Sequence, residues 1–452
     1  MSVNSKMTAI ADAIRAKTGG TGLLTLDNMA TEIENITIGI NINGVVQEWP
    51  VKAGNTITEG DFVQLIKTGW GASLPEFEVT DLASRNYVQG FLLSPTRLLI
   101  LYTLLTTAEY PNKTLYGLIY NYVNGEWIAG TGKVIRNATF GDLYLSLNSN
   151  LVLPFDENNF AVLTLYDAHA TETNYLRIVL NYASVADNVL TITSKNILTG
   201  LASVANAASC KLNDDYAVLF ARYSKSDAAT TYINSAWVLH RDPDTGTYTV
   251  GAEKTGLSNY TGLERIDDTH VLQYNRTTSA TCAYRVLEIS GSTISSVSTG
   301  SFTTAAYSAV KSLSDGYIVV AGTNTLKLYK LEDTTLVDTG ASATFTADSS
   351  YAQIIPLSSN QGILFKGNNW YEFFIDYNTP TITLNTPVTK EQVVSASLNG
   401  DFLCVTAGTE VRLYSSETLN TEAMSYVGII DGVAKTGGGA GSNIEIYVPM
   451  EE

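Results

Sequence analysis

The stretch Leu212–Val218 reads LNDDYAV: an apolar residue, a polar turn and then a run of apolar residues. The pattern occurs seven times, and its first apolar residue, which we call the anchor, is Leu93, Phe155, Leu212, Ile266, Leu313, Leu357 and Leu398. Each copy predicts a β-hairpin, because Asn, Asp, Ser and Gly tolerate the backbone angles of a tight turn between two strands. Successive anchors lie 41 to 62 residues apart, a drifting spacing typical of propeller blades joined by unequal loops.

A second hairpin pattern follows each anchor, for example at residues 326–329 with 335–337. Two hairpins per repeat make four strands, which is one propeller blade. The sequence therefore predicts an all-β protein whose residues 76–424 form a β-propeller of about seven blades. Six or eight blades are the alternatives if the first or last anchor belongs to a flanking sheet.

Strand patterns also lie on both sides of the predicted propeller, as in Phe62–Ile66 and Ile444–Pro449. A closed propeller returns its last blade beside its first, so both flanks leave it from the same place. We therefore expect residues 39–75 and 425–452 to form one small β-sandwich or barrel into which the propeller is inserted. Two unrelated terminal arms are the alternative.

Residues 1–38 are the one part of the chain with a helical pattern. Apolar residues three or four apart predict two short amphipathic helices, separated by Gly19-Gly20. Helices this short do not bury their apolar stripes alone, so they need a partner surface. The residues that we expect to make this attachment are Ile10, Ile14, Met29, Ile33 and Ile36.

The composition excludes some classes of function. The chain has 452 residues and a net charge of −17, and its Lys and Arg residues are not clustered, which argues against nucleic-acid binding. The apolar stretch 91–105 is interrupted by Pro95 and Arg97 and is too short to span a bilayer. The first residues do not read as a signal peptide, so we expect a protein made in the cytosol, without membrane insertion. Three cysteines predict buried free thiols rather than a disulfide framework.

Catalytic, metal-binding and cofactor-binding patterns are not found in the sequence. The histidines His169, His240 and His270 lie in different repeats without the spacing of metal ligands. The acidic pairs at 156–157, 214–215 and 267–268 recur at the hairpin turn, so turn geometry explains them better than catalysis does. We therefore expect a protein that is not an enzyme.

Aromatic residues near the predicted blade ends are the best candidates for a binding surface. Aromatic rings beside Asn and Asp are suited to stacking on sugars and to bonding their hydroxyl groups. The alternative for each ring is packing between blades. The candidates for glycan-binding loops are Tyr110, Tyr175, Tyr232, Trp370 and Tyr371.

Two stretches of the N-terminal segment, MTAIADAIRAKTG at Met7–Gly19 and LTLDNMATEI at Leu24–Ile33, carry a resemblance. They resemble the leader of tail and baseplate-associated proteins of bacteriophages and prophages of Gram-positive bacteria. The segments Ala53–Val63 and Gly432–Pro449 are similar to the opening and close of small β-domains in phage structural proteins. The resemblance covers about a fifth of the chain and does not extend to the propeller. It implies a component of a virion or tail-like particle, with the leader docking onto that particle.

Together these patterns predict a phage tail fibre or receptor-binding protein located in the virion. Its N-terminal region would dock on other tail, baseplate or virion proteins, and its propeller would face host surface polysaccharide. Copies would assemble as a homo-oligomer, so that weak glycan contacts gain through multivalency. The alternatives are a tail-borne glycan depolymerase and a capsid or collar decoration protein without a ligand.

Overall fold

The structure is a computed structural model. It describes residues 44–52, 55–80, 85–104, 114–137, 152–167, 176–186, 189–201, 203–225, 232–242, 247–260, 262–275, 281–303, 308–425 and 431–449. The chain divides into a small unit (Met1–Gln64 with Ala423–Glu452) and a propeller unit (Leu65–Glu422). The predicted helical leader lies outside the described residues. The one helical element within them is the single 3-10 turn η1 (Ser416–Thr418), and none of their helices is long and apolar enough to cross a membrane.

The propeller unit is built of antiparallel sheets, which we number in chain order. Sheet 1 contains β5 (Arg85–Ser94), β6 (Arg97–Leu104), β7 (Thr114–Val123), β8 (Glu126–Ala129) and β9 (Lys133–Asn137). Sheet 2 contains β10 (Val152–Pro154), β11 (Asn159–Asp167), β12 (Leu176–Ala186) and β13 (Val189–Leu201). Sheet 3 contains β14 (Ser203–Lys211), β15 (Tyr216–Ser224), β16 (Ile233–Arg241) and β17 (Tyr248–Val250).

Sheets 4 to 6 likewise follow chain order, and sheet 7 takes its last strand from earlier in the chain. Sheet 4 contains β18 (Gly262–Arg265), β19 (His270–Tyr274), β20 (Thr281–Ser290) and β21 (Thr293–Thr303). Sheet 5 contains β22 (Ala309–Lys311), β23 (Tyr317–Ala321), β24 (Thr325–Glu332) and β25 (Thr335–Thr344). Sheet 6 contains β26 (Gln353–Pro356), β27 (Gln361–Lys366), β28 (Asn369–Asp376), β29 (Thr381–Leu384) and β30 (Val388–Thr389). Sheet 7 contains β31 (Ser395–Asn399), β32 (Phe402–Ala407), β33 (Glu410–Ser415) and β4 (Phe77–Val79).

The predicted hairpins are confirmed, because in every sheet the first strand pairs antiparallel with the second at the turn that follows an anchor. The polar turn residues hold these turns. The side-chain oxygen of Asn213 accepts hydrogen bonds from the backbone N–H groups of Asp215 (3.0 Å) and Tyr216 (2.9 Å). Asp267 does the same for Thr269 and His270, both at 2.8 Å. The recurring Asn and Asp therefore stabilise the turns.

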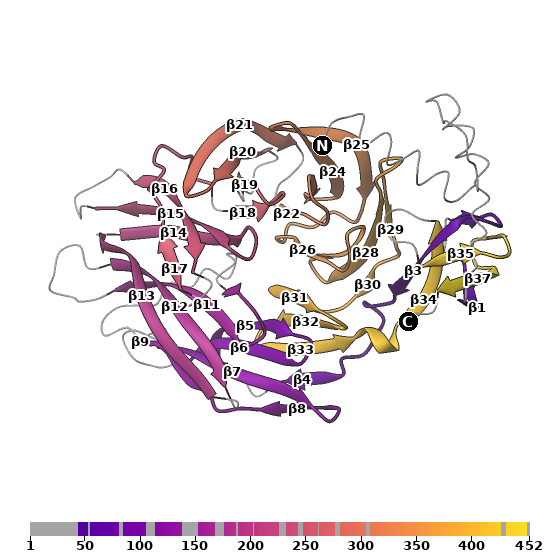
Figure 1. Cartoon of the computed structure of the whole chain (residues 1–452), viewed down its shortest axis with the longest axis horizontal. Helices are drawn as coiled ribbons and strands as arrows, with labels where there is room; N and C mark the ends of the chain where they lie inside the picture. The colour runs from indigo at the N-terminus through magenta and orange to yellow at the C-terminus, as the bar shows by residue number, and fades with distance from the viewer. Residues whose placement is uncertain are drawn as a thin grey trace, which may run out of the picture. The chain divides into compact units, whose positions relative to one another are not determined.

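The sheets are arranged around a common centre, as in a β-propeller (Figure 1). The first strands of neighbouring sheets contact one another in the order β10, β14, β18, β22, β26, β31 and β5. Buried apolar clusters fill the space between successive sheets, and one cluster joins sheet 7 to sheet 1. On β11, Phe160 and Val162 pack toward sheet 1 while Ala161 and Leu163 pack toward sheet 3. Both faces of such a strand are buried, which explains the uninterrupted apolar runs in the repeat.

Sheet 7 is completed by a strand from much earlier in the chain. β4 pairs antiparallel with β33, with Val79 opposite Val411 and Glu78 opposite Arg412. The Arg412 guanidinium lies 2.8 Å from a carboxylate oxygen of Glu78 and also contacts Glu391 and Glu410. A strand contributed in this way connects the beginning and the end of the propeller unit through hydrogen bonds.

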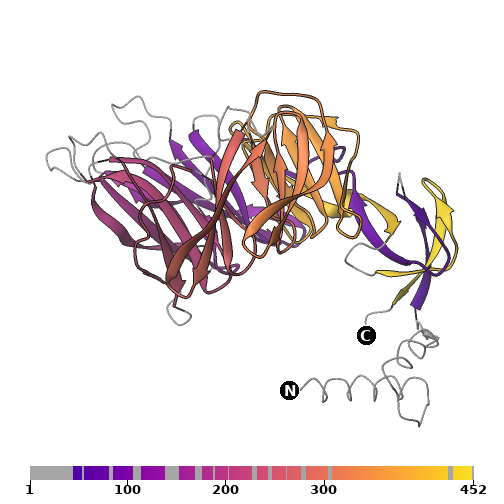
Figure 2. The same cartoon turned by 90° about the horizontal axis from the view of Figure 1, so that it is seen from above.

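The small unit contains strands from both flanks of the propeller. Its main sheet has the order β1 (Gly44–Pro50), β37 (Asn443–Pro449), β35 (Gly432–Ala434), β3 (Phe62–Thr68) and β34 (Asn420–Ser425). A second, two-stranded sheet pairs β2 (Thr56–Ile57) with β36 (Gly438–Gly439). Figure 2 shows indigo and yellow strands, from opposite ends of the chain, together in this unit. Ile57, Val63, Ile444 and Ile446 are buried in it.

Candidate ligand-binding pocket

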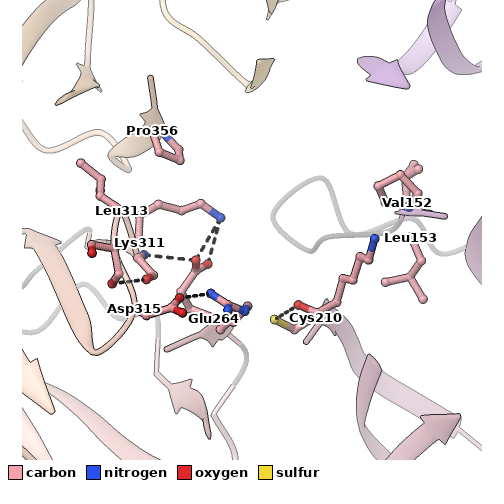
Figure 3. A pocket seen from close by; sticks show the side chains of 13 residues that line it. Val152, Leu153, Cys210, Glu264, Lys311, Leu313, Asp315 and Pro356 are labelled. Atoms are coloured by element: carbon pink, nitrogen blue, oxygen red, sulfur yellow. Dashed lines mark hydrogen bonds and ion pairs between the residues drawn. The ribbon is translucent and has the colours of Figure 1, made fainter. Parts of the chain in front are cut away.

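A cavity of about 340 Å³ lies in the propeller unit, at the ends of the first strands of sheets 2 to 6. We call it the axial pocket (Figure 3). The first strands bring its walls together because each contacts the first strand of the next sheet. Its lining residues are Val152, Leu153, Pro154, Cys210, Lys211, Glu264, Arg265, Lys311, Ser312, Leu313, Ser314, Asp315 and Pro356.

Most of these lining residues occupy equivalent positions of the repeat. The two residues directly before an anchor, which we call the pre-anchor pair, line the pocket in four sheets: Leu153-Pro154, Cys210-Lys211, Glu264-Arg265 and Lys311-Ser312. In sheet 6 the second member of the pair, Pro356, lines it as well. Ionisable pre-anchor residues are confined to sheets 3, 4 and 5, so the axial pocket is charged on one side.

Lys311 and Glu264 form an ion pair between sheets 5 and 4. The Lys311 ammonium lies 3.0 Å and 3.1 Å from the two carboxylate oxygens of Glu264, and the backbone N–H of Ser312 donates to the same carboxylate at 3.2 Å. The Glu264 side chain is only 8% exposed, whereas that of Lys311 is 28% exposed. Burial lowers the pKa of Lys311, but the Glu264 carboxylate outweighs burial, so the pKa is raised overall. Lys311 therefore keeps its charge at neutral pH.

Arg265 is fixed by three acceptors on different segments. Its Nε donates to the backbone oxygen of Leu212 at 2.7 Å, and its terminal nitrogens donate to Asp315 at 2.7 Å and to Asp268 at 2.9 Å. Burial lowers the pKa of Arg265, and the hydrogen bonds with the two carboxylates more than offset it. A guanidinium has five N–H donors, so three contacts hold its plane without using its full capacity.

Lys211 and Cys210 come from the end of β14. The Lys211 ammonium lies 2.8 Å from Asp214, whose side chain is 86% exposed. Burial, with the nearby Glu264 carboxylate, raises the pKa of the Cys210 thiol to about 12. Because the thiolate is the nucleophilic form of cysteine, Cys210 is unreactive at neutral pH. The polar groups that the pocket presents are therefore ion-paired cations, and its thiol is not an activated nucleophile.

The expectation for two of the aromatic candidates was wrong. Trp370 and Tyr371 are only 2% and 3% exposed, because β28 is packed between neighbouring sheets. The Trp370 ring contacts those of Phe365 and Tyr414, with centroids 4.9 Å and 5.4 Å apart. Neither Trp370 nor Tyr371 has an accessible face on which a sugar could stack.

Tyr232, a third aromatic candidate, is not among the residues that line the axial pocket. Tyr232 is half-buried, with the Arg222 guanidinium 4.5 Å from its ring centroid. Tyr110 and Tyr175 lie outside the described residues, as do the attachment candidates Ile10, Ile14, Met29, Ile33 and Ile36.

Sequence reasoning missed the charged lining of the axial pocket, although the sequence carries a signal for it. The seven anchors align the repeats, and the residues directly before them are apolar, Pro or Ser except in three consecutive repeats. These exceptions supply Cys210, Lys211, Glu264, Arg265 and Lys311. A departure from the repeat at equivalent positions in neighbouring copies marks a candidate functional site.

The described residues contain no group of three or more His, Cys, Asp or Glu side chains placed to hold a metal ion. Comparison with known proteins gives no matching family model and no matching curated protein. Comparison with solved structures gives weak similarities that cover about three quarters of the chain. One is a Bacteroides fragilis protein provisionally assigned as a 6-phosphogluconolactonase, at 12% identity and a TM-score of 0.45, covering 73% of this chain and 96% of that one.

Two further similarities are of the same strength. A functionally unknown protein from Desulfotomaculum acetoxidans is 11% identical with a TM-score of 0.44, covering 74% of this chain and 96% of its own. The β-propeller domain of the Trilobed protease from Pyrococcus furiosus is 10% identical with a TM-score of 0.42. The similarity covers 76% of this chain and 99% of that domain. Similarities this weak say nothing about activity.

Proposed function

We propose that the chain is a structural component of a bacteriophage particle that binds a carbohydrate of the host surface through its propeller. The observation that carries the binding role is the axial pocket, whose charged lining departs from the repeat in three neighbouring sheets. The resemblance of residues 1–38 to phage tail and baseplate leaders supports a place in the particle. In this proposal the leader forms two helices and docks through Ile10, Ile14, Met29, Ile33 and Ile36.

The architecture that belongs to this proposal is a closed propeller of seven blades, one for each sheet. Its support is the apolar cluster between sheets 7 and 1 together with the pairing of β4 with β33. The small unit would attach the propeller to neighbouring tail, baseplate or virion proteins, and copies would follow the symmetry of the particle. Several weak pockets on one particle would then bind a polymeric surface together.

Binding is favoured over hydrolysis by how the carboxylates of the axial pocket are used. Glycoside hydrolysis requires one carboxyl group that gives a proton and a second that acts as base or nucleophile. Both lining carboxylates accept hydrogen bonds from cations, Glu264 from Lys311 and Asp315 from Arg265. Such pairs are suited to holding the cations in place.

Co-sedimentation with cell walls of Gram-positive bacteria tests this function. Purified full-length protein is incubated with isolated cell-wall polysaccharide, and the pellet and the reducing ends in the supernatant are measured. We expect the protein to pellet without releasing reducing ends. Release of reducing ends would establish the depolymerase instead, and absence of both would leave the decoration role. Detection of the chain in purified particles by mass spectrometry checks its location.

A further inference from the structure

We infer that the axial pocket binds a sugar carrying an anionic group, a carboxylate or a phosphate. The inference rests on the proposed function, which supplies the expectation that the ligand is a sugar. The lining of the pocket supplies the expectation that this sugar is anionic. The lining has three cationic side chains, Lys211, Arg265 and Lys311. Each is ion-paired: Lys211 with Asp214, Arg265 with Asp268 and Asp315, and Lys311 with Glu264. An anionic group is favoured through the N–H donors that these cations retain, because a hydrogen bond between two ionised groups is stronger than one to a neutral hydroxyl.

The fold does not require these charges. At the same position of the repeat as Lys211 and Arg265, sheet 2 has Pro154 and sheet 6 has Pro356, and both prolines line the same cavity. Burying Lys311 with Glu264 costs desolvation of both groups, and apolar side chains of similar size commonly stabilise a fold as well or better. The ion pair is therefore better explained by a ligand than by stability.

The cations are held in place before any ligand arrives. The Lys311 ammonium has contacts to both oxygens of Glu264, and Arg265 has three acceptors. An ammonium has three N–H donors and a guanidinium has five, so both retain donor capacity beyond these contacts. Figure 3 shows the Lys311 ammonium directed into the cavity above the Glu264 carboxylate. Preorganised donors lower the entropy lost on binding.

The remaining lining suits the body of a sugar. Val152 and Leu153 lie on one side of the cavity and Leu313 and Pro356 on the other, with the charged groups between them (Figure 3). These apolar walls can contact the C–H face of a sugar ring while the cations bind its acidic group. A volume of about 340 Å³ is at the lower end of the range for small-molecule pockets. The pocket therefore fits one charged sugar residue of a polymer rather than a long segment.

Isothermal titration calorimetry on the full chain at low salt tests the inference. The probes are glucuronate, glucose 6-phosphate, glucose and inorganic phosphate, so that the carboxylate, the phosphate and the sugar are separated. The variants are Lys211→Ala, whose exposed partner Asp214 leaves no buried charge behind, and the neutral double variant Lys311→Met with Glu264→Gln. The matched control is Lys327→Ala, which removes a lysine paired with Asp338 on the outer strands β24 and β25.

The inference requires that at least one charged sugar binds more tightly than glucose and inorganic phosphate. Removal of a charge-assisted contact in either pocket variant should weaken this binding about tenfold or more, and Lys327→Ala should leave it within about twofold. The inference would be overturned if glucose bound as tightly as the charged sugars, or if neither charged sugar bound. It would also be overturned if Lys327→Ala lost as much affinity as the pocket variants. If cell-wall sedimentation persists in both pocket variants, the proposed function stands and the pocket inference fails. If charged sugars bind but the protein does not sediment with cell walls, the pocket inference stands and the proposed function fails.

Discussion

Two lysines at strand ends of the propeller unit, Lys311 on β22 and Lys366 on β27, have opposite pKa shifts. Lys366 is 1% exposed, and its ammonium donates to the backbone oxygen of Ser350 at 2.6 Å. Burial lowers the pKa of Lys366 to about 8, against the opposing effect of Asp348. Burial acts on Lys311 in the same direction, but Glu264 raises its pKa above the ordinary value.

The difference shows what the axial pocket does for its lysine. A neutral carbonyl oxygen does not compensate an ammonium for lost water, whereas a carboxylate in contact does. Glu264 therefore keeps Lys311 positively charged over the whole neutral range. Four predictions follow from this contrast, in order of the size of the expected effect on stability.

Lys311→Ala should have the largest effect, because it leaves the Glu264 carboxylate buried without its ammonium. We expect the free energy of unfolding to fall by about 3 kcal/mol, the lower end for broken buried pairs, since Lys311 is partly exposed. The double variant Lys311→Met with Glu264→Gln should lie within about 1 kcal/mol of the original protein. Urea denaturation measures both. A double variant as unstable as the single one would contradict the explanation.

Glu264→Gln should make Lys311 behave like Lys366. Without the carboxylate, the effect of burial on Lys311 outweighs the smaller opposing effect of Cys210, so its pKa should fall. We expect the free energy of unfolding to fall by about 2 kcal/mol at pH 7. Because a buried lysine with a lowered pKa is destabilising while it is charged in both states, this loss should shrink as the pH rises toward 10. Unfolding curves at pH 7 and pH 9.5 test this, and the same loss at both values would count against it.

Lys366→Met should act in the opposite direction and stabilise the protein at neutral pH. The pKa of Lys366 is about 8 in the folded state and near 10.5 when unfolded. Below pH 8 the folded state holds a buried charge, and between these values it releases the proton first, so the stability of the original protein rises with pH. The variant also loses the hydrogen bond to Ser350, which offsets part of this gain. We therefore expect its free energy of unfolding to exceed that of the original protein by about 1 to 2 kcal/mol at pH 7. The gain should vanish toward pH 10, and a gain independent of pH would refute the assignment.

Lys211→Ala should have the smallest effect on stability. Its partner Asp214 is 86% exposed and remains hydrated when the lysine is removed. We expect the free energy of unfolding to change by less than about 0.5 kcal/mol, as for other solvent-exposed ion pairs. Thermal or urea unfolding measures it, with Lys327→Ala as the comparison. A loss above about 1 kcal/mol would mean that Lys211 supports the fold as well as the pocket.

The sequence was sufficient for the repeat and its hairpins because both depend on local chemistry. An anchor, an Asn or Asp at the turn and an apolar run determine a hairpin within about eight residues. The recurrence of the acidic pairs predicts turn residues, and Asp267 does accept the backbone hydrogen bonds of its turn. The apolar runs also indicated strands that are buried, although they did not say against which neighbours.

The site was not predicted, because its residues meet only through the arrangement of the sheets. Lys311 and Glu264 are 47 residues apart in the sequence and in contact across two sheets. The sequence predicts an exposed ring at Trp370, but the strand that carries it is covered on both sides by neighbouring sheets. Aromatic content alone does not distinguish a ring packed between sheets from one on a loop. Aligning the repeats on their anchors would have shown the charged positions, but not that they surround a cavity.

The pairing of β4 with β33 also has a consequence for the order in which the protein is made. A ribosome completes Phe77–Val79 early, and this segment then waits for its partner until Val411 has emerged. At about 5 to 20 residues per second, the wait lasts roughly 15 to 70 seconds. During translation β4 has no partner strand, and the last completed sheet has one apolar face without a neighbour. Release of the nascent chain before Val411 would leave the strand edge of β4 and this apolar face open to other chains.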